Sequence, residues 1–535
     1  MKVFKSIMLY LLILLGLATA AVLICCVIMI CSPNTSIFGY KYISYKDVLE
    51  ESVSLTSGEY SGVNAVSITS NRMDIRILPN VESNSDVKIV YSQGMSGFVK
   101  QDAVDLKVTI SKDDTHEFES GDSSLSGNTY KTLCIDVSEP DGIIFLADCY
   151  IKVYLPSKVY DVVNAYTKNG GIDFSSKNES KKITVNNLYL MSTSRDVGKK
   201  AITIYKPASS RYYVRTSVGH CYFNNDKEAF GGNIIFETNG GKLIAKNGAI
   251  KGSLTVRTST DVNGATLDIT ELNGNLTFVA RSGNISIANV EKGSNSEYPK
   301  VDIQSKYCNA KIDKLTGIIT TQGYEGGDVD NIDITINELI RQTDTMIDID
   351  SGKGNIVINK LYGSANLVSS TGNITVKEAN SKELYVDTHN GLINLSFVES
   401  DLNLTKLDIH VSKRSNMNLN NIKGTVNIVV DSGDSRNINM TFHSKVTDNA
   451  EMCTVNVTSN GDNININKIG SGKFAVYTDG DIACDVAQNM DIHDTDADYD
   501  RKNNMSVQKR FNYTVPSTNH SKIYVHNNNH VSVNQ

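Results

Sequence analysis

The stretch Leu367–Val376, LVSSTGNITV, decides the fold of this chain. Two short runs in which apolar and polar residues alternate flank a bend of small polar residues and one glycine. Because side chains alternate between the two faces of a β-strand, Ile374 and Val376 are predicted to point inward and Thr375 outward. Gly372 is expected to supply backbone freedom at the bend, where a side chain would clash.

The same pattern recurs along the chain. Further copies are AYTKNGGIDF (165–174), VRTSVGHCYF (214–223), IFETNGGKLI (235–244), FVARSGNISI (278–287), IDIDSGKGNIVI (347–358), YVDTHNGLINL (385–395), VNVTSNGDNINI (455–466) and AVYTDGDIACDV (475–486). The bend glycines 354, 372 and 391 are 18 and 19 residues apart (372−354 and 391−372). A fixed period of about 20 residues is typical of a solenoid. We therefore predict an all-β fold, a single-stranded parallel β-solenoid (β-helix).

Composition excludes some classes of protein. The 52 basic and 59 acidic residues give a net charge of −7, and no basic stripe is present, so nucleic acid is not an expected partner. The 9 cysteines form no CxxC motif, which argues against a zinc ribbon or a thioredoxin-type site. Cys221 and Cys484 are expected to be small buried apolar residues. Cys134 and Cys149 lie in neighbouring predicted strands, and the sequence leaves open whether they form a disulfide.

A membrane anchor is predicted at the N-terminus. Residues 7–30 are apolar and uncharged, and 24 helical residues span about 36 Å, enough to cross a hydrocarbon core of about 30 Å. Lys2 and Lys5 precede this run, so the N-terminus is expected in the cytoplasm and the rest of the chain outside the cell. A cleaved signal peptide is the alternative, because Ala18-Thr19-Ala20 has the composition of a cleavage site. The apolar run continues 10 residues past Ala20, which favours an uncleaved anchor. We expect a single-pass protein of the cell membrane with an extracellular C-terminal region.

The chain divides into six predicted regions. These are a cytoplasmic N-terminus (1–6), a transmembrane helix (7–30), a membrane-proximal spacer (31–60), an N-terminal β portion or cap (61–156), the solenoid repeats (157–490) and a polar Asn/Asp-rich tail (491–535). Strands are expected in the cap at 65–68, 73–78, 87–91, 106–110, 133–137 and 150–155, with a polar loop over 111–128. The tail retains short alternations at 511–515 and 522–527, which predict a loose strand or two.

Threonines recur just before the bends. They are Thr167, Thr216, Thr238, Thr388, Thr458 and Thr478. A ligand-binding face would need a regular threonine in every coil, but Ala280, Asp350 and Asp431 interrupt the series. The threonines are therefore predicted to form a structural ladder of hydroxyls.

Two groups of acidic residues are candidate chemical sites. The acidic run 494–500 has the alternating carboxylates of a calcium loop, but Tyr499 and Met505 stand where such a loop needs glycine and glutamate, so a solvated loop is expected. Clustered aspartates could act as an acid–base pair if they converged to about 5–9 Å. Those considered are Asp328, Asp330, Asp333, Asp348 and Asp350. They alternate within predicted strands with no His or Arg beside them, and His220 and His389 are expected as exposed bend residues. We assign no catalytic, cofactor-binding or metal-ligating residue, and we expect no cofactor and no enzymatic activity.

The layout resembles a known family. Leading strands are followed by a strand that ends in Leu-Pro (150–156) and by T-x-x-G-x-I-x-I coils that begin at 167–174. This layout is similar, over about 60–535, to the bacterial DUF4097 family of adhesin-like, or "toastrack", β-solenoids. The resemblance implies an envelope-associated protein with a role in adhesion or envelope stress, and no catalytic residues to carry over.

Two functions are consistent with these features as hypotheses. The first is a non-catalytic, membrane-anchored cell-surface β-solenoid, an adhesin or an envelope structural or stress-associated protein. Its partners would be the membrane and a surface glycan or an envelope or matrix protein, in an oligomeric state that the sequence leaves open. The alternative is a membrane-anchored, carbohydrate-active β-helix enzyme.

Overall fold

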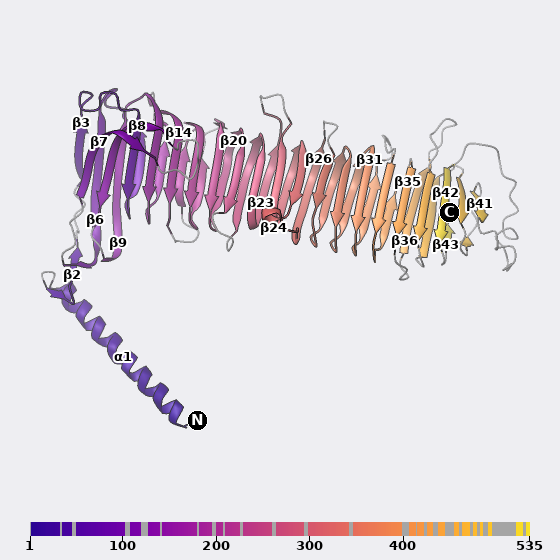
Figure 1. Ribbon diagram of the computed structural model, residues 1–535, viewed down its shortest axis with the longest axis horizontal. Helices are drawn as coiled ribbons and strands as arrows, with labels where there is room; N and C mark the ends of the chain where they lie inside the picture. The colour runs from indigo at the N-terminus through magenta and orange to yellow at the C-terminus, as the bar shows by residue number, and fades with distance from the viewer. Residues whose placement is uncertain are drawn as a thin grey trace. The chain divides into compact units, whose positions relative to one another are not determined.

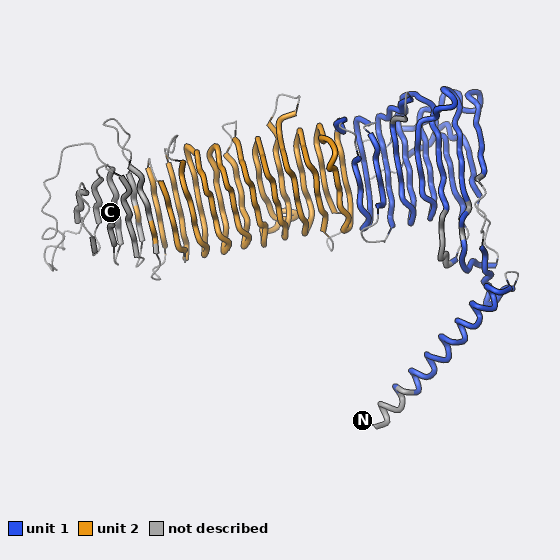
Figure 2. The backbone as a smooth tube through the Cα atoms, turned by 180° about the vertical axis from the view of Figure 1, so that it is seen from behind, with its two compact units in different colours: residues 1–232 blue, residues 233–535 orange. Residues whose placement is uncertain are grey.

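Strands make up most of the chain, as the repeat predicts (Figure 1). The computed structural model describes residues 2–32, 35–44, 50–101, 107–118, 127–139, 142–178, 181–194, 200–206, 209–224, 228–258, 264–293, 298–341, 346–398, 406–413, 415–421, 425–431, 437–444, 454–459, 463–470, 474–478, 482–484, 490–494, 521–527 and 531–534. The chain divides into two compact units, Met1–Gly232 (unit 1) and Asn233–Gln535 (unit 2), which are coloured separately in Figure 2.

Unit 1 begins with helix α1 (Lys2–Cys31), where the anchor is predicted. Its segment Tyr10–Cys31 is 22 residues long and apolar enough to cross a membrane. Leu14 and Leu17 are 65% and 66% exposed, although leucine in water-soluble proteins is usually covered. The apolar surface of α1 is thus available to lipid.

The strands of unit 1 stack in two parallel columns. In the first column the order is β8 (Thr129–Ser138), β4 (Ala65–Ser70), β10 (Val159–Thr167), β14 (Thr184–Ser192) and β16 (Ser209–Thr216). In the second it is β9 (Gly142–Leu155), β5 (Asp74–Pro79), β11 (Ile172–Ser175), β15 (Lys200–Tyr205) and β17 (His220–Asn224). The early strands β4, β5, β8 and β9 therefore belong to the same parallel columns as the repeats, although they lack the repeat period.

Antiparallel strands cover the outer end of each column. Strand β7 (Lys107–Glu117) pairs with β8, and β6 (Val87–Lys100) pairs with β9. Strands β2 (Tyr40–Ser44) and β3 (Glu50–Leu55) pair with β6, and β1 (Ser36–Ile37) pairs with β2. Such strands occupy backbone groups that would otherwise form an exposed sheet edge. The predicted loop over 111–128 is wrong for residues 111–117, because β7 has no buried face and so lacks the apolar alternation that marks a strand.

Unit 2 also consists of two parallel columns. The first contains β19 (Asn233–Thr238), β21 (Leu254–Thr258), the first part of β23 (Leu276–Val290) and of β24 (Lys300–Thr316), β25 (Ile318–Gln322), β27 (Ile347–Asp350), β29 (Ala365–Ser369), β31 (Glu383–Thr388), β33 (Lys406–Val411), β35 (Thr425–Val430) and β37 (Thr454–Ser459). The second contains β20 (Lys242–Lys251), β22 (Ala265–Asn273), the second part of β23 and β24, β26 (Asn331–Ile340), β28 (Ile356–Tyr362), β30 (Ile374–Asn380), β32 (Ile393–Phe397), β34 (Met417–Asn420), β36 (Asn437–Ser444) and β38 (Asn463–Gly470). Each coil of the repeat contributes one segment to each column, as a β-solenoid requires.

The core consists of inward side chains that stack from coil to coil. Ile374 is fully buried and lies between Ile356 and Ile393 of the neighbouring strands. Thr375 is half-buried and lies between Val357 and Asn394. The predicted alternation in this stretch is confirmed.

Close packing, and not the predicted backbone freedom, explains the bend glycines 372 and 391, neither of which has a positive φ. A Cβ atom on Gly372 would lie closer than 3.0 Å to the carbonyl oxygen of Gly354, and one on Gly391 would lie as close to that of Gly372. The coils approach so closely here that the bend has no room for a side chain.

Hydroxyl side chains close these bends. The Gly170 amide donates to Thr167 Oγ1 at 3.0 Å, and the Gly372 amide donates to Ser369 Oγ at 2.9 Å. Thr167, Thr216, Thr238 and Thr388 are at most 2% exposed. Thr238 Oγ1 also accepts from a bend amide, that of Gly241, at 2.7 Å, so the predicted structural role is confirmed for Thr167 and Thr238. The side chains of Thr458 and Thr478 lie outside the described residues.

The C-terminal segment returns into the sheet. Strand β42 (Ser521–Asn527) pairs in parallel with β37 and with β39 (Phe474–Thr478), and β43 (Val531–Asn534) pairs with β38 and with β40 (Ile482–Cys484). The loose strand expected at 522–527 is thus an inner strand with neighbours on both sides. Strand β41 (Met490–Asp494) pairs with β39, while residues 495–500 and the strand predicted at 511–515 lie outside the described residues.

Candidate functional site

A cleft of about 670 Å³ opens in unit 2 beside the bend between β25 and β26. The chain leaves β25 at Gln322 and makes a single turn, η1 (Tyr324–Gly326), before β26 begins. Glu325 and Gly326 adopt left-handed backbone conformations with φ of 53° and 77°. The connection is longer than the next one along the chain, which joins Asp350 of β27 to Ile356 of β28. The cleft is lined by Arg281, Lys306, Tyr324, Glu325, Gly327, Asp328, Val329, Asp330, Lys353 and Ser370.

Charges of both signs line the cleft, and the Asp330 carboxylate interacts with three neighbouring side chains. Lys353 Nζ lies 2.9 Å from Asp330 Oδ1, and the Tyr307 hydroxyl donates to Oδ2 at 2.7 Å. Lys306 Nζ lies 3.9 Å from the same Oδ2 atom. The hydrogen bonds from Lys353 and Tyr307 lower the pKa of Asp330. This carboxylate is therefore ionised and acts as a hydrogen-bond acceptor.

The five aspartates considered as an acid–base group have different surroundings. Asp328 and Asp330 line the cleft. Asp333 accepts a hydrogen bond from the backbone N–H of Asn355 at 2.8 Å, and Asp348 accepts one from Asn366 Nδ2 at 2.9 Å. Asp350 accepts one from the backbone N–H of Gly352 at 2.8 Å. Asp333 lies on β26 whereas Asp348 and Asp350 lie on β27, in the other column. Asp333 and Asp348 thus join neighbouring coils, whereas Asp350 accepts a hydrogen bond within its own bend.

Polar side chains on the outer faces form ladders from coil to coil. The backbone N–H of Asn373 donates to Asn355 Oδ1 at 2.9 Å, and the backbone N–H of Leu392 donates to Asn373 Oδ1 at 3.0 Å. A second ladder joins Asn394, Asn418 and Asn439 through side-chain hydrogen bonds of 2.8 and 3.0 Å. The outer surface of unit 2 therefore presents ordered rows of amide groups.

One ladder contains a titratable group. His410 on β33 lies between Asp387 and Asp431, with Nδ1 3.3 Å from Asp387 Oδ1 and Nε2 2.9 Å from Asp431 Oδ2. His389 lies nearby in sequence, with Nδ1 2.6 Å from Ser412 Oγ. His220 and His389 are both half-buried, so the expectation that they are exposed is wrong.

We predict that the contribution of His410 to stability falls as pH rises. Desolvation acts to lower its pKa, but the hydrogen bonds to Asp431 and Asp387 outweigh it, and the pKa is raised. A raised pKa in the folded state stabilises the fold below the unfolded value of about 6.5, and this contribution is lost as pH rises through the folded pKa. The side chains of His410, Asp387 and Asp431 are 46%, 53% and 51% exposed. The contribution to the free energy of unfolding should therefore stay below about 1 kcal/mol.

Hydrogen exchange of β31, β33 and β35 measures this contribution. His410→Gln should increase exchange relative to the unsubstituted chain at about pH 5.5 and make no difference at about pH 8.5. A difference of equal size at the two pH values would contradict the raised pKa.

Several cysteines of the described part of the chain, among them Cys134, Cys221 and Cys308, are free thiols. Cys221 is fully buried, as expected, and burial raises its pKa, while the side chain of Cys484 lies outside the described residues. Cys149 donates to the Gly94 carbonyl at 3.4 Å, and Cys134 Sγ lies 3.8 Å from His116 Nδ1, so the two are not paired with each other.

One group of side chains that could hold a metal ion lies in unit 1. Among the described residues, Asp113, His116 and Cys134 bring three potential ligand atoms within 4.8 Å of one another. Sequence reasoning missed both this group and the cleft. The unusually long bend over 318–334 was the available signal for the cleft, whereas the group in unit 1 depends on a strand irregularity that leaves no mark in the sequence.

Comparisons with known proteins give little similarity. Neither a protein-family model nor a curated protein matches the chain. One solved structure, described as a "putative cell adhesion protein" from Clostridium sporogenes, is 11% identical with a TM-score of 0.22 and covers 55% of this chain and 100% of its own. Such a low TM-score leaves the function to be inferred from the residues of this chain.

Proposed function

We propose that this chain is a non-catalytic, membrane-anchored protein of the cell surface that binds a surface glycan through the cleft of unit 2. A role in adhesion or in envelope structure, of the kind implied by the resemblance to the DUF4097 family, is part of the proposal. The observation that carries it is the cleft itself, a site lined by charges of both signs beside the lengthened bend between β25 and β26.

The residues directly after α1 support the anchor. Phe38 is 87% exposed at the tight turn between β1 and β2, where Phe38 and Gly39 both have positive φ, and Tyr40 is 37% exposed. Aromatic side chains within a few residues of a transmembrane helix are typical of the membrane–water interface. In the proposed topology this turn lies at the outer membrane surface.

The cleft suits a hydroxyl-rich ligand. Sugar hydroxyl groups both donate and accept hydrogen bonds, so they can bind carboxylates such as Asp328 and ammonium groups such as Lys306 at the same time. The charges come in balanced numbers, with Arg281, Lys306 and Lys353 facing Glu325, Asp328 and Asp330. Such a site favours an uncharged or zwitterionic polymer over a strongly anionic one.

The state of Asp330 favours binding over hydrolysis. Glycoside hydrolysis needs one carboxylic acid with a raised pKa to protonate the leaving group. The pKa of Asp330 is lowered by Lys353 and Tyr307, so this residue suits hydrogen bonding to a ligand. The carbohydrate-active enzyme stays the second candidate because Asp328 lines the same cleft.

Adhesion of intact cells tests the proposed function. Cells that display the full chain should adhere to one or more surfaces of a glycan panel, and protease treatment of the intact cells should abolish adhesion. Lys306→Glu with Lys353→Glu should lower the apparent affinity at least about tenfold, because the double charge reversal leaves Asp330 facing like charges. Lys360→Glu is the matched control, since Lys360 is 48% exposed on β28 and pairs with Glu378 instead.

Other outcomes would overturn parts of the proposal. Adhesion that survives protease treatment would contradict the topology. Equal adhesion by the cleft variant and the control would place the binding surface elsewhere. Release of reducing ends from a polysaccharide, lost in Asp330→Asn, would favour the enzyme.

A further inference from the structure

An irregularity in the β7–β8 pairing brings three potential ligands to one place. Asp113 is opposite Thr132 and His116 is opposite Tyr130. Between these two pairs β7 advances by three residues and β8 by two. In a regular strand, residues three apart point to opposite faces. The extra residue is a β-bulge, and it turns His116 onto the face that carries Asp113. Cys134 lies on the same face of β8, two residues from Thr132, and is therefore a diagonal neighbour of Asp113.

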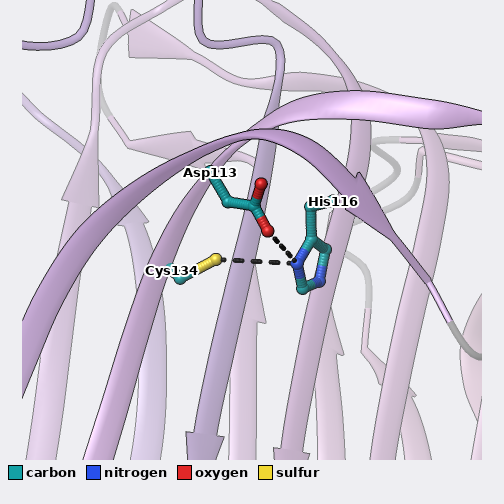
Figure 3. Close-up of side chains that lie close together, drawn as sticks. All are labelled: Asp113, His116 and Cys134. Atoms are coloured by element: carbon teal, nitrogen blue, oxygen red, sulfur yellow. Dashed lines mark hydrogen bonds and ion pairs between the residues drawn. The ribbon is translucent and has the colours of Figure 1, made fainter.

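The three side chains converge on one nitrogen atom (Figure 3). His116 Nδ1 lies 3.2 Å from Asp113 Oδ2 and 3.8 Å from Cys134 Sγ. Nδ1 carries at most one hydrogen. When Nδ1 carries a hydrogen and donates it to the Asp113 carboxylate, Nδ1 cannot accept the hydrogen of the Cys134 thiol. When Nδ1 accepts from the thiol, it has no hydrogen to donate to the carboxylate oxygen, and the two acceptor atoms repel each other. No single protonation state gives both contacts a good hydrogen bond.

A cation between the three atoms resolves this conflict. Zinc bonds of about 2.0–2.3 Å at a tetrahedral angle place neighbouring ligand atoms about 3.3–3.6 Å apart. The two measured separations, 3.2 and 3.8 Å, bracket that range, and all three atoms lie within 4.8 Å of one another. Sulfur, imidazole nitrogen and carboxylate oxygen together form a ligand set that favours zinc over magnesium or calcium.

The surroundings hold the ligands in position. The Thr115 amide donates to Asp113 Oδ1 at 3.0 Å, which leaves Oδ2 directed at His116. The His116 ring lies edge-on to Phe118, with centroids 4.7 Å apart, and Cys134 is 8% exposed. Partners of this kind orient metal ligands in known sites. The side chains of His116 and Asp113 are 28% and 43% exposed, so an ion can enter from solvent.

We propose that Asp113, His116 and Cys134 bind one zinc ion, with a fourth position open to water. The ion would join β7 to β8 across the bulge and so fasten the antiparallel strand that covers the first column of unit 1. The zinc site is independent of the proposed function, since the cleft belongs to unit 2.

Cobalt(II) titration tests the site with a spectroscopic signal. The full chain in detergent, kept reduced and stripped of metal, should bind one equivalent of Co²⁺ with a sulfur-to-cobalt charge-transfer band, and Zn²⁺ should displace it. Cys134→Ser should remove that band, and Asp113→Asn should weaken binding at least about tenfold. Cys149→Ser is the matched control, because Cys149 is also a buried cysteine of unit 1 and its substitution should leave the band unchanged.

A second measurement guards against misfolded variants. Zn²⁺ should slow hydrogen exchange of the β7 amides in the unsubstituted chain and in Cys149→Ser, but not in Cys134→Ser or Asp113→Asn. Absence of the band in the unsubstituted chain, an equal band in Cys134→Ser, or unchanged exchange of β7 on adding Zn²⁺ would each overturn the proposal.

Discussion

Ile374→Asp is expected to unfold the middle of unit 2, whereas Thr375→Asp, one residue further along, leaves it folded. Ile374 is fully buried between Ile356 and Ile393. A carboxylate in that column must take up a proton or draw in water, at a cost of several kcal/mol. In a stack where each coil contacts only its neighbours, such a loss separates the coils on either side of it.

Thr375→Asp is the matched control. Thr375 is half-buried on the outer face, and its neighbours Val357 and Asn394 carry no charge. The new carboxylate stays in solvent, so the change should cost less than about 1 kcal/mol. Urea unfolding of the full chain in detergent compares the two variants, and hydrogen exchange of residues 354–395 locates the loss. Equal destabilisation by the two substitutions would contradict the inward and outward assignment of this strand.

The coil architecture was predictable because its determinants are local. Each repeat carries its own apolar alternation, and residues such as Leu367 and Val376 are buried wherever the coil stacks. The bend residues were also readable, since Ser369 and Thr167 close bends in the same way in both units. A regular stack lets one short pattern specify many contacts.

The cap and the C-terminal segment were harder because their partners are distant in sequence. Strand β4 pairs with β8 and β10, so the chain makes β6 and β7 before it returns to the column. Strand β42 likewise lies between β37 and β39, although it comes after both in the sequence. Alternation identifies a strand, but it does not identify the strand's neighbours.

The candidate sites depend on departures from the pattern. The cleft exists because η1 lengthens one bend, and the sequence showed that length without showing which charges would meet there. Asp113 and His116 share a face only because of the bulge in β7. A period-two reading places these two residues on opposite faces, so it would have rejected them as co-ligands.

Gly372→Ala should destabilise unit 2 by several kcal/mol although it adds a single methyl group. The new Cβ would lie closer than 3.0 Å to the carbonyl oxygen of Gly354, which is backbone of the adjacent coil and cannot rotate away. Relief requires the coils to separate, and separation breaks hydrogen bonds such as the one from Ser369 Oγ to the carbonyl oxygen of Gly354. Crowding of this kind in a packed region typically costs about 1–3 kcal/mol and more where backbone must move.

Gly58→Ala supplies the control of opposite sign. No atom lies within 4 Å of a Cβ at Gly58, and its φ is outside the left-handed range. Alanine at such a position restricts the unfolded chain and should leave stability unchanged or raise it by about 0.4–1 kcal/mol. The two variants are compared by urea unfolding, with hydrogen exchange reporting on residues 354–395. If Gly372→Ala proves as harmless as Gly58→Ala, the coils do not approach closely enough to require glycine, and the repeat of glycines at 354, 372 and 391 must have another cause.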